Sequence, residues 1–151
     1  MRFLIVVGLA AAVATPLRAQ SGPDLSTAVP IAGSWSYAAV GDGSEALFAS
    51  LGGAPQLWIH CTRATRRVSI AKAAAAAAPF LNVWTSAQAR SVPASFNPAT
   101  GRLTVQLDAY DGLLDGIANS RGRVGFTVAT QPSLVLPAWP EAARVIEDCR
   151  A

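Results

Sequence analysis

The chain has 151 residues, of which 52% are hydrophobic and 14% charged, so it is too apolar to be a disordered chain. It is also too short for two ordinary domains. Twelve Lys and Arg residues against nine Asp and Glu residues give a net charge of +3.

The first 19 residues have the layout of a secretory signal peptide. Arg2 precedes an apolar run over residues 3–14, and small residues follow up to Ala19. This run is too short to span a bilayer as a helix. We expect cleavage near Ala19, a periplasmic or secreted mature protein, and no stable membrane insertion after cleavage. Without Arg2 and Arg18 the net charge falls to +1, and export argues against nucleic acid as a partner.

The rest of the chain predicts a single β-rich domain. Residues 20–30 are rich in Pro, Ser and Gly and predict a flexible arm, so residues 31–151 form the domain. Apolar and polar residues then alternate in short runs broken by Gly and Pro, which is typical of strands. The alternation recurs at residues 35–39, 45–49, 57–62, 68–70, 81–85, 102–108, 124–128 and 134–136.

Turns and helices complete this pattern. Residues 41–43, Gly-Asp-Gly, predict a tight turn built on positive φ angles. The alanine run 73–78 predicts a loop or one helical turn, since Pro79 closes it. Residues 110–118 carry a helical apolar stripe, with Asp108 available as N-cap, and residues 139–150 predict a last helix. The predicted fold is an antiparallel β-sandwich or flattened barrel of about seven strands with two short helices.

The two cysteines predict a disulfide. Cys61 lies on the apolar face of its strand, and Cys149 lies on the apolar face of the last helix. Cysteines of an exported protein usually pair. A redox role would need a Cys-x-x-Cys motif, which the sequence lacks, and a zinc site would need more ligands than two distant cysteines and one histidine. We expect a bond that fastens the last helix to the sheet.

Basic residues gather in the middle of the sequence. Residues 46–107 contain six bases and no acid, which predicts a basic surface if their polar faces come together. The candidate residues for binding an anion or a partner are Arg63, Arg66, Arg67, Arg90, Trp58 and Trp84, together with Arg121 and Arg123. The last two flank Gly122 and could grip a carboxylate or phosphate. They also suit an ordinary helix C-terminus, which we favour.

Catalytic and metal sites have weaker support. His60 is the only histidine, so any Ser-His-Asp or Cys-His mechanism must use it, yet no nucleophile motif accompanies it. Asp111 and Asp115 stand four residues apart on the predicted helix, where they could share a proton or hold a cation. The apolar stripe lies on the other side of that helix, which favours a solvated surface. We predict no catalytic residue, no metal and no cofactor.

Three segments of the sequence resemble known exported proteins. Residues 120–123, 134–139 and 144–150 resemble an uncharacterised family of exported Gram-negative bacterial proteins, a resemblance that implies no activity. The plan of an early core cysteine and a late one on a closing helix is similar to periplasmic accessory proteins of type VI secretion. Residues 32–35, Ala-Gly-Ser-Trp, after a flexible arm resemble small periplasmic inhibitors of metalloproteases, whose arm enters the protease cleft.

These patterns together favour recognition over catalysis. We expect a non-enzymatic binding or accessory protein that presents a basic face to an acidic protein or an envelope component. One alternative is a small periplasmic protease inhibitor that acts through residues 20–30. The other, from a different class, is a hydrolase that uses His60.

Overall fold

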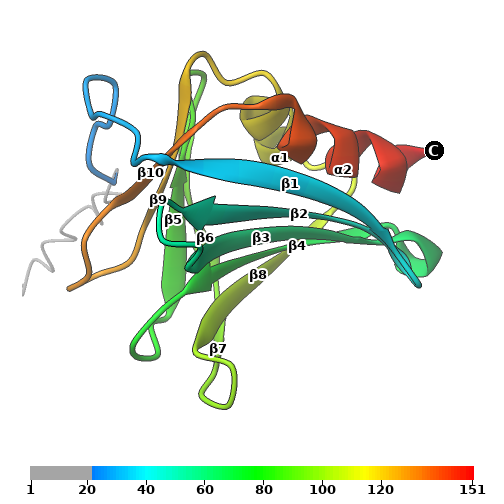
Figure 1. Cartoon of the computed structure of the whole chain (residues 1–151), viewed down its shortest axis with the longest axis horizontal. Coiled ribbons are helices and arrows are strands. Elements are labelled where there is room, and N and C mark those ends of the chain that lie inside the picture. The colour runs from blue at the N-terminus through cyan, green and yellow to red at the C-terminus, as the bar shows by residue number, and fades with distance from the viewer. Residues whose placement is uncertain (1–21) are drawn as a thin grey trace, which may run out of the picture.

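A computed structural model describes residues 22–151 of the chain, which form two antiparallel sheets and two helices (Figure 1). One sheet follows the order β1 (Gly33–Val40), β2 (Gly43–Ser50), β3 (Pro55–Thr62), β4 (Arg67–Ala73), β8 (Arg102–Asp108) and β7 (Ser95–Asn97). The other follows the order β10 (Leu134–Pro137), β9 (Arg123–Thr127), β5 (Phe80–Trp84) and β6 (Ala89–Pro93). The helices are α1 (Gly112–Ala118) and α2 (Pro140–Arg150). The expected signal peptide lies outside the described residues.

The predicted fold class is confirmed: the domain is mainly β, with two antiparallel sheets that do not close into a barrel. Residues 22–151 contain ten strands where about seven were expected. The additional strands include β6 and β7, each of which places a single apolar side chain inward, Val92 and Phe96. One inward residue produces no alternation that a sequence pattern can reveal.

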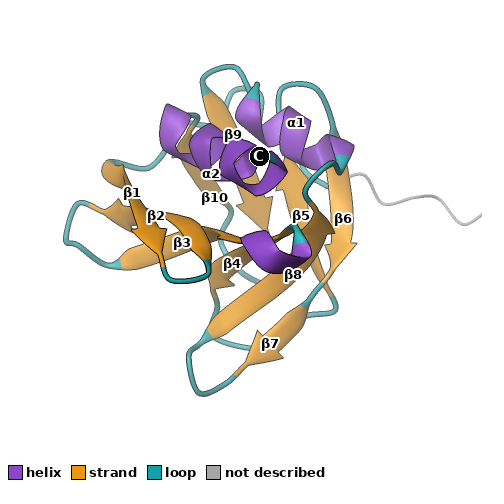
Figure 2. Ribbon diagram, turned by 90° about the vertical axis from the view of Figure 1, so that its right-hand side faces the viewer, coloured by secondary structure: helices purple, strands orange, loops and turns teal. Residues whose placement is uncertain are grey.

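The core lies between the two sheets and under the helices. Side chains alternate along β3 as predicted: Leu57, Ile59 and Cys61 are fully buried, whereas Trp58 and His60 lie on the opposite face. Figure 2 shows α2 above β1, β2 and β3, with α1 beside it. α2 contacts the inner face of the six-stranded sheet, and residues of the outer face, such as Trp58 and His60, are only partly buried, so that face borders solvent.

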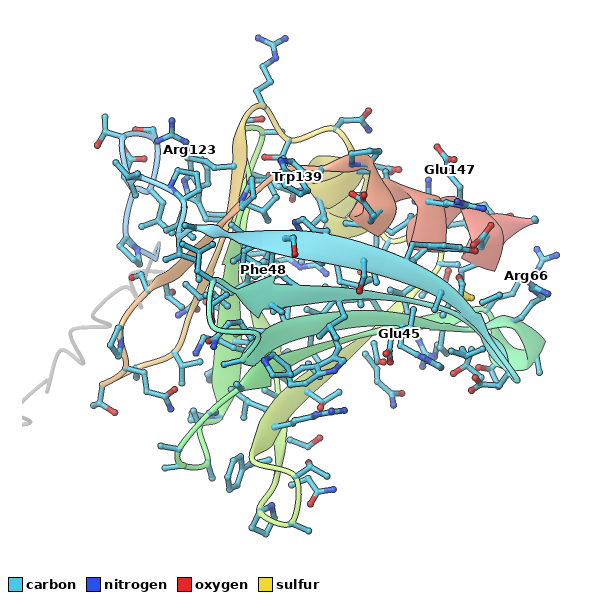
Figure 3. All side chains as sticks on the ribbon, in the orientation of Figure 1. Glu45, Phe48, Arg66, Arg123, Trp139 and Glu147 are labelled. Atoms are coloured by element: carbon cyan, nitrogen blue, oxygen red, sulfur yellow. A yellow bond between two sulfur atoms is a disulfide. The ribbon has the colours of Figure 1, made fainter. Side chains whose placement is uncertain are left out.

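A tryptophan joins the two sheets near the start of β1. The Trp35 ring packs edge-on against Phe48, with 5.5 Å between ring centroids, and Figure 3 shows Phe48 beneath β1. The Trp35 indole N–H donates to the carbonyl of Pro137 in β10 over 2.9 Å. The indole is buried and its polar atom is satisfied, so it stabilises the corner where the sheets meet.

The turn between β1 and β2 forms for a different reason from the one predicted. Neither Gly41 nor Gly43 has a positive φ. Gly43 is needed because a Cβ atom at this position would lie 2.0 Å from the carbonyl oxygen of Cys61 on β3. A Cβ at Gly41 would meet nothing within 4 Å. The close approach of β2 to β3 at this point therefore requires glycine at position 43, and the sequence of the turn alone does not reveal this approach.

The N-cap of α1 is not the residue predicted from the sequence. Asp111, not Asp108, precedes the helix with an extended backbone, and its Oδ1 accepts a hydrogen bond from Leu113 N–H over 2.8 Å. The helix consequently starts at Gly112, and Tyr110 stays outside it with 59% of its surface exposed. The alanine run forms no helix, as expected from Pro79, and none of the helices described is long and apolar enough to cross a membrane.

The N-terminal segment differs from the expected free arm over its described part, residues 22–30. Leu25 is 6% exposed and sits on Gly125 of β9, where an added Cβ would lie 2.1 Å from Leu25 Cδ1. Arg123 Nη1 donates to the carbonyl of Ala28 over 2.6 Å. Gly125 has no side chain, and this leaves the space on β9 that Leu25 occupies. The Pro, Ser and Gly content of residues 20–30 does not reveal this contact, because it depends on a distant strand.

The predicted disulfide is present between Cys61 of β3 and Cys149 of α2. Their Cα atoms are 5.4 Å apart, within the usual range, and both residues are fully buried. The bond closes a loop between positions separated by 88 residues. It fastens the last turn of α2 to the end of β3, one of the central strands of the six-stranded sheet.

We expect removal of this bond to lower the free energy of unfolding by about 4 to 5 kcal/mol, because a loop of this length gains much entropy in the unfolded chain. The variant is Cys61→Ala with Cys149→Ala, measured by urea unfolding with and without reductant. Reductant should destabilise the natural chain and leave the variant unchanged. Two free thiols in protein recovered from its native compartment would contradict the pairing.

A matched glycine pair tests the contact at the β1–β2 turn. Gly43→Ala should destabilise the protein by about 1 to 3 kcal/mol, since the methyl group collides with a backbone carbonyl that cannot turn away. Gly41→Ala should change the free energy of unfolding by less than about 0.5 kcal/mol. Both values come from urea unfolding. Equal effects at the two positions would show that the strand spacing is not the constraint.

Candidate functional site

Three exposed arginines gather where β3 turns into β4, and we call Arg63, Arg66 and Arg67 the arginine corner. A 3₁₀ turn, η1 (Arg63–Thr65), connects the strands, and Arg66 follows it in the left-handed region at φ 49°. The Arg66 N–H donates to the Arg63 carbonyl over 3.2 Å. The backbone of the corner is therefore fixed on both sides by strands, while its side chains stay in solvent.

None of the three guanidinium groups forms an ion pair within residues 22–151. Arg66 Nη1 lies 3.4 Å from the hydroxyl of Tyr110, and this hydroxyl donates to the Arg150 carbonyl over 3.1 Å. Tyr110 is thus a neutral neighbour that orients Arg66 without cancelling its charge. This role is not apparent from the sequence, where the spacing of Tyr110 places it on the predicted apolar stripe of residues 110–118.

Arg150 lies beside the corner but is already engaged. Its Nη1 is 2.9 Å from Asp115 Oδ1, its Nε donates to the Ala109 carbonyl over 2.7 Å, and its guanidinium lies 5.6 Å from the Tyr110 ring centroid. A cation with these partners stabilises the junction of α1 and α2 rather than offering charge to a ligand. The exposed cations at this end are therefore the three arginines of the corner.

The other predicted residues do not join the corner, so one continuous basic face does not form. Figure 3 shows Arg66 at one end of the molecule and Arg123 at the other, beside the N-terminal segment. Arg121 is exposed on the α1–β9 connection. Trp84 lies on β5 opposite Gly125, where Leu25 is seated.

Trp58 is covered by an arginine that the prediction did not include. Arg102 of β8 stacks over the Trp58 ring, with 3.6 Å from its guanidinium carbon to the ring centroid. The side chain crosses β4 at Ala71, the register partner of Trp58, whose small size leaves room. The exposed face of Trp58 is therefore already covered by a cation.

Lys72 contributes no surface charge, although it belongs to the basic stretch of the sequence. It is 6% exposed on the inner face of β4, between Leu57 and Leu103 in register, and its Nζ donates to the Ala73 carbonyl over 3.0 Å. Burial lowers the pKa of Lys72 below 10.5 because the charged form is poorly solvated there. Lys72 occupies an inward-facing position of β4, in phase with Val68 and Ile70, where the strand pattern would otherwise place an apolar residue.

Asp111 and Asp115 hold different partners and do not form the carboxylate pair considered above. Asp111 Oδ2 lies 2.8 Å from Arg90 Nη2, and Asp115 pairs with Arg150. The hydrogen bond from Arg90 is the main reason that the pKa of Asp111 falls below 3.8, and the Leu113 N–H adds to it against the effect of burial. Arg90 is consequently part of the α1 cap rather than a free cation.

His60 contacts two carboxylates on the outer face of the six-stranded sheet. Its Nε2 is 3.1 Å from Asp42 Oδ2, and its Nδ1 is 3.5 Å from Glu45 Oε2. Within residues 22–151 no hydroxyl or thiol is hydrogen bonded to this ring. Each ring nitrogen therefore faces a carboxylate, whereas a general base needs one nitrogen free to contact the group from which it takes a proton.

Comparisons with protein families, curated proteins and solved structures find no match to this chain. The resemblances inferred from the three C-terminal segments stay predictions. In the part of the chain that the structure describes, no three His, Cys, Asp or Glu side chains lie together as a metal site would require. The geometry of the arginine corner is the best-defined basis for a functional assignment.

The Arg90–Asp111 contact leads to a prediction about acid sensitivity. The pKa of Asp111 is lower in the folded protein than in the unfolded chain, so its contribution is complete above pH 3.8 and is lost as pH falls through the folded value. Asp111→Ala should cost about 1 kcal/mol at pH 7, because both the cap and the ion pair are lost. Asp111→Asn keeps a capping side chain and should cost less.

Urea unfolding at pH 7 and near pH 3 measures the effect. The natural chain should lose more stability on acidification than Asp111→Asn does, since the amide does not titrate. Asp108→Asn is the control, because Asp108 is exposed and has no ion pair within the described residues. Identical acid sensitivity in all three proteins would contradict the assignment.

Proposed function

We propose that this is an exported, non-enzymatic binding or accessory protein that recognises an acidic partner, a protein or an envelope component, through the arginine corner. The observation that carries this proposal is the set of three exposed guanidinium groups on a fixed turn, none paired with a carboxylate in residues 22–151. Unpaired guanidinium groups bind carboxylates and phosphates through two parallel hydrogen bonds.

The residues around the arginine corner hold its backbone in one conformation, which favours binding of a partner. Cys61 precedes Arg63 by two residues, and its bond to Cys149 ties the end of β3 to α2. The turn is therefore held in place before a partner arrives, so little ordering entropy opposes binding. Exposed charges of one sign also increase the rate of encounter with an acidic partner.

A periplasmic or secreted location belongs to the same proposal. A disulfide between buried cysteines is typical of an oxidising compartment, and it agrees with the signal peptide predicted for residues 1–19. The other two hypotheses gain less support. Residues 22–30 lie on β9 through Leu25, so they are not free to enter a protease cleft, and His60 has no hydrogen-bonded nucleophile among the described residues.

Charge reversal tests the corner. Arg66→Glu and Arg67→Glu should each weaken binding of a fluorescent polyglutamate peptide by about tenfold or more, the loss expected from one charge-assisted contact of about 1.5 kcal/mol. The difference should shrink at high salt because the contacts are exposed. The same variants should lose partners captured from envelope extract.

Arg121→Glu is the matched control, since it makes the same change in net charge on the α1–β9 connection. It should bind nearly as well as the natural chain. Equal weakening by all three reversals would mean that only net charge matters, and binding that is indifferent to reversal and to salt would remove the proposal.

A further inference from the structure

The free edge of β1 has unpaired backbone groups. β1 is the outermost strand of the six-stranded sheet and pairs only with β2. The Leu51 N–H donates to the Ala32 carbonyl, and antiparallel hydrogen bonds alternate along a pair, so even-numbered residues of β1 bond to β2. The N–H and C=O groups of Tyr37 and Ala39 therefore point away from the sheet, on the side that has no neighbouring strand.

This edge lacks the devices by which proteins usually block strand pairing, namely short length, charged side chains and proline. The other three sheet edges in residues 22–151 each have one: β7 has three residues, β10 ends in Pro137, and β6 contains Arg90 and Pro93. β1 has eight residues without a charge or a proline. Of the described edges it is the one left open to an added strand.

An open groove of about 590 Å³ lies between α2 and Tyr37 of this strand. It is lined by Tyr37 of β1 and by residues of α2, namely Pro140, Glu141, Ala143, Arg144 and Glu147. Figure 2 shows α2 chiefly above β2 and β3, with β1 at the side of the helix. Every second side chain of a strand added to β1 would point to the face of the sheet on which α2 and this groove lie.

The groove has more negative than positive charge. Arg144 is turned onto the Tyr37 ring, 3.9 Å from its centroid, and leaves Glu141 and Glu147 without an ion pair within the described residues. Glu141 Oε2 is buried and accepts no hydrogen bond. The Tyr37 hydroxyl donates to Asp148 over 2.6 Å. Two carboxylates without an ion pair in residues 22–151, beside a single arginine, favour an occupant that carries positive charge and N–H donors.

We infer that the free edge of β1 and the α2 groove form a docking site for an extended, basic polypeptide segment of a partner protein. The segment adds a strand beside β1, bonds to the backbone of Tyr37 and Ala39, and directs Lys or Arg side chains to Glu141 and Glu147. This surface is separate from the arginine corner and selects the opposite charge. A second copy of this chain fits less well, because its β1 has no basic residue and its α2 would bring further carboxylates.

The test uses a fluorescent peptide of alternating lysine and valine with the full mature chain. Binding should protect the amide protons of Tyr37 and Ala39 from hydrogen exchange measured by NMR. The same peptide with alternate backbone amides methylated should bind at least tenfold more weakly, since it keeps the charge and loses the ladder hydrogen bonds.

Two substitutions separate the edge from the groove. Ala39→Pro removes an outward N–H and leaves the β2 ladder intact, and Glu147→Lys reverses an exposed charge without affecting the core. Each should weaken peptide binding by tenfold or more. Asp24→Lys, on the N-terminal segment, makes the same change in net charge as Glu147→Lys and should have no effect.

Three results would overturn the inference. They are peptide binding without protection of Tyr37 and Ala39, equal weakening by Glu147→Lys and Asp24→Lys, and no binding at about 1 mM peptide. A β1-to-β1 dimer detected by sedimentation, with exchange protection of the same amides in the absence of peptide, would assign the edge to a second copy instead.

Discussion

The covalent contact between β3 and α2 is the constraint on which both candidate surfaces depend. Cys149 lies in the last turn of α2 and Cys61 near the end of β3, so their bond sets where the helix crosses the six-stranded sheet. The same placement puts Arg150 beside Tyr110 at the arginine corner and carries Arg144 over the Tyr37 ring at the groove. A helix of eleven residues would hold this position weakly by itself.

Charge in this protein is organised by tertiary contacts rather than by its order along the chain. The middle of the sequence has six bases, yet Lys72 is buried, Arg90 caps α1 through Asp111, and Arg102 covers Trp58. The arginines of that stretch that stay exposed and form no ion pair within the described residues are the three of the arginine corner, at the turn between β3 and β4. The acidic side chains of α2 border a separate groove, so two surfaces of opposite sign lie on one small domain.

Local periodicity was sufficient to predict most strands, both helices and the disulfide, because each depends on side chains that alternate or recur within a few residues. β6 and β7 escaped this reasoning, since Val92 and Phe96 are their only inward apolar residues. The seat of Leu25 on Gly125 and the approach of Gly43 to Cys61 depend on distant segments. The candidate site divides in the same way. The three arginines of the corner are nearly contiguous in sequence and were among the residues proposed from it, whereas the contact with Tyr110 and the α2 groove depend on packing between distant segments.

The burial of Lys72 has a consequence for chemistry on the intact protein. It is the only lysine in the chain, its side chain is 6% exposed, and its amine donates to the Ala73 carbonyl. Acylating reagents that attack neutral amines should react with this side chain much more slowly in the folded protein than after the sheet opens. The rate of acylation of Lys72 therefore reports how often the sheet opens. Because the chain has no other lysine, a dye that reacts with the α-amino group would leave the folded domain otherwise unmodified.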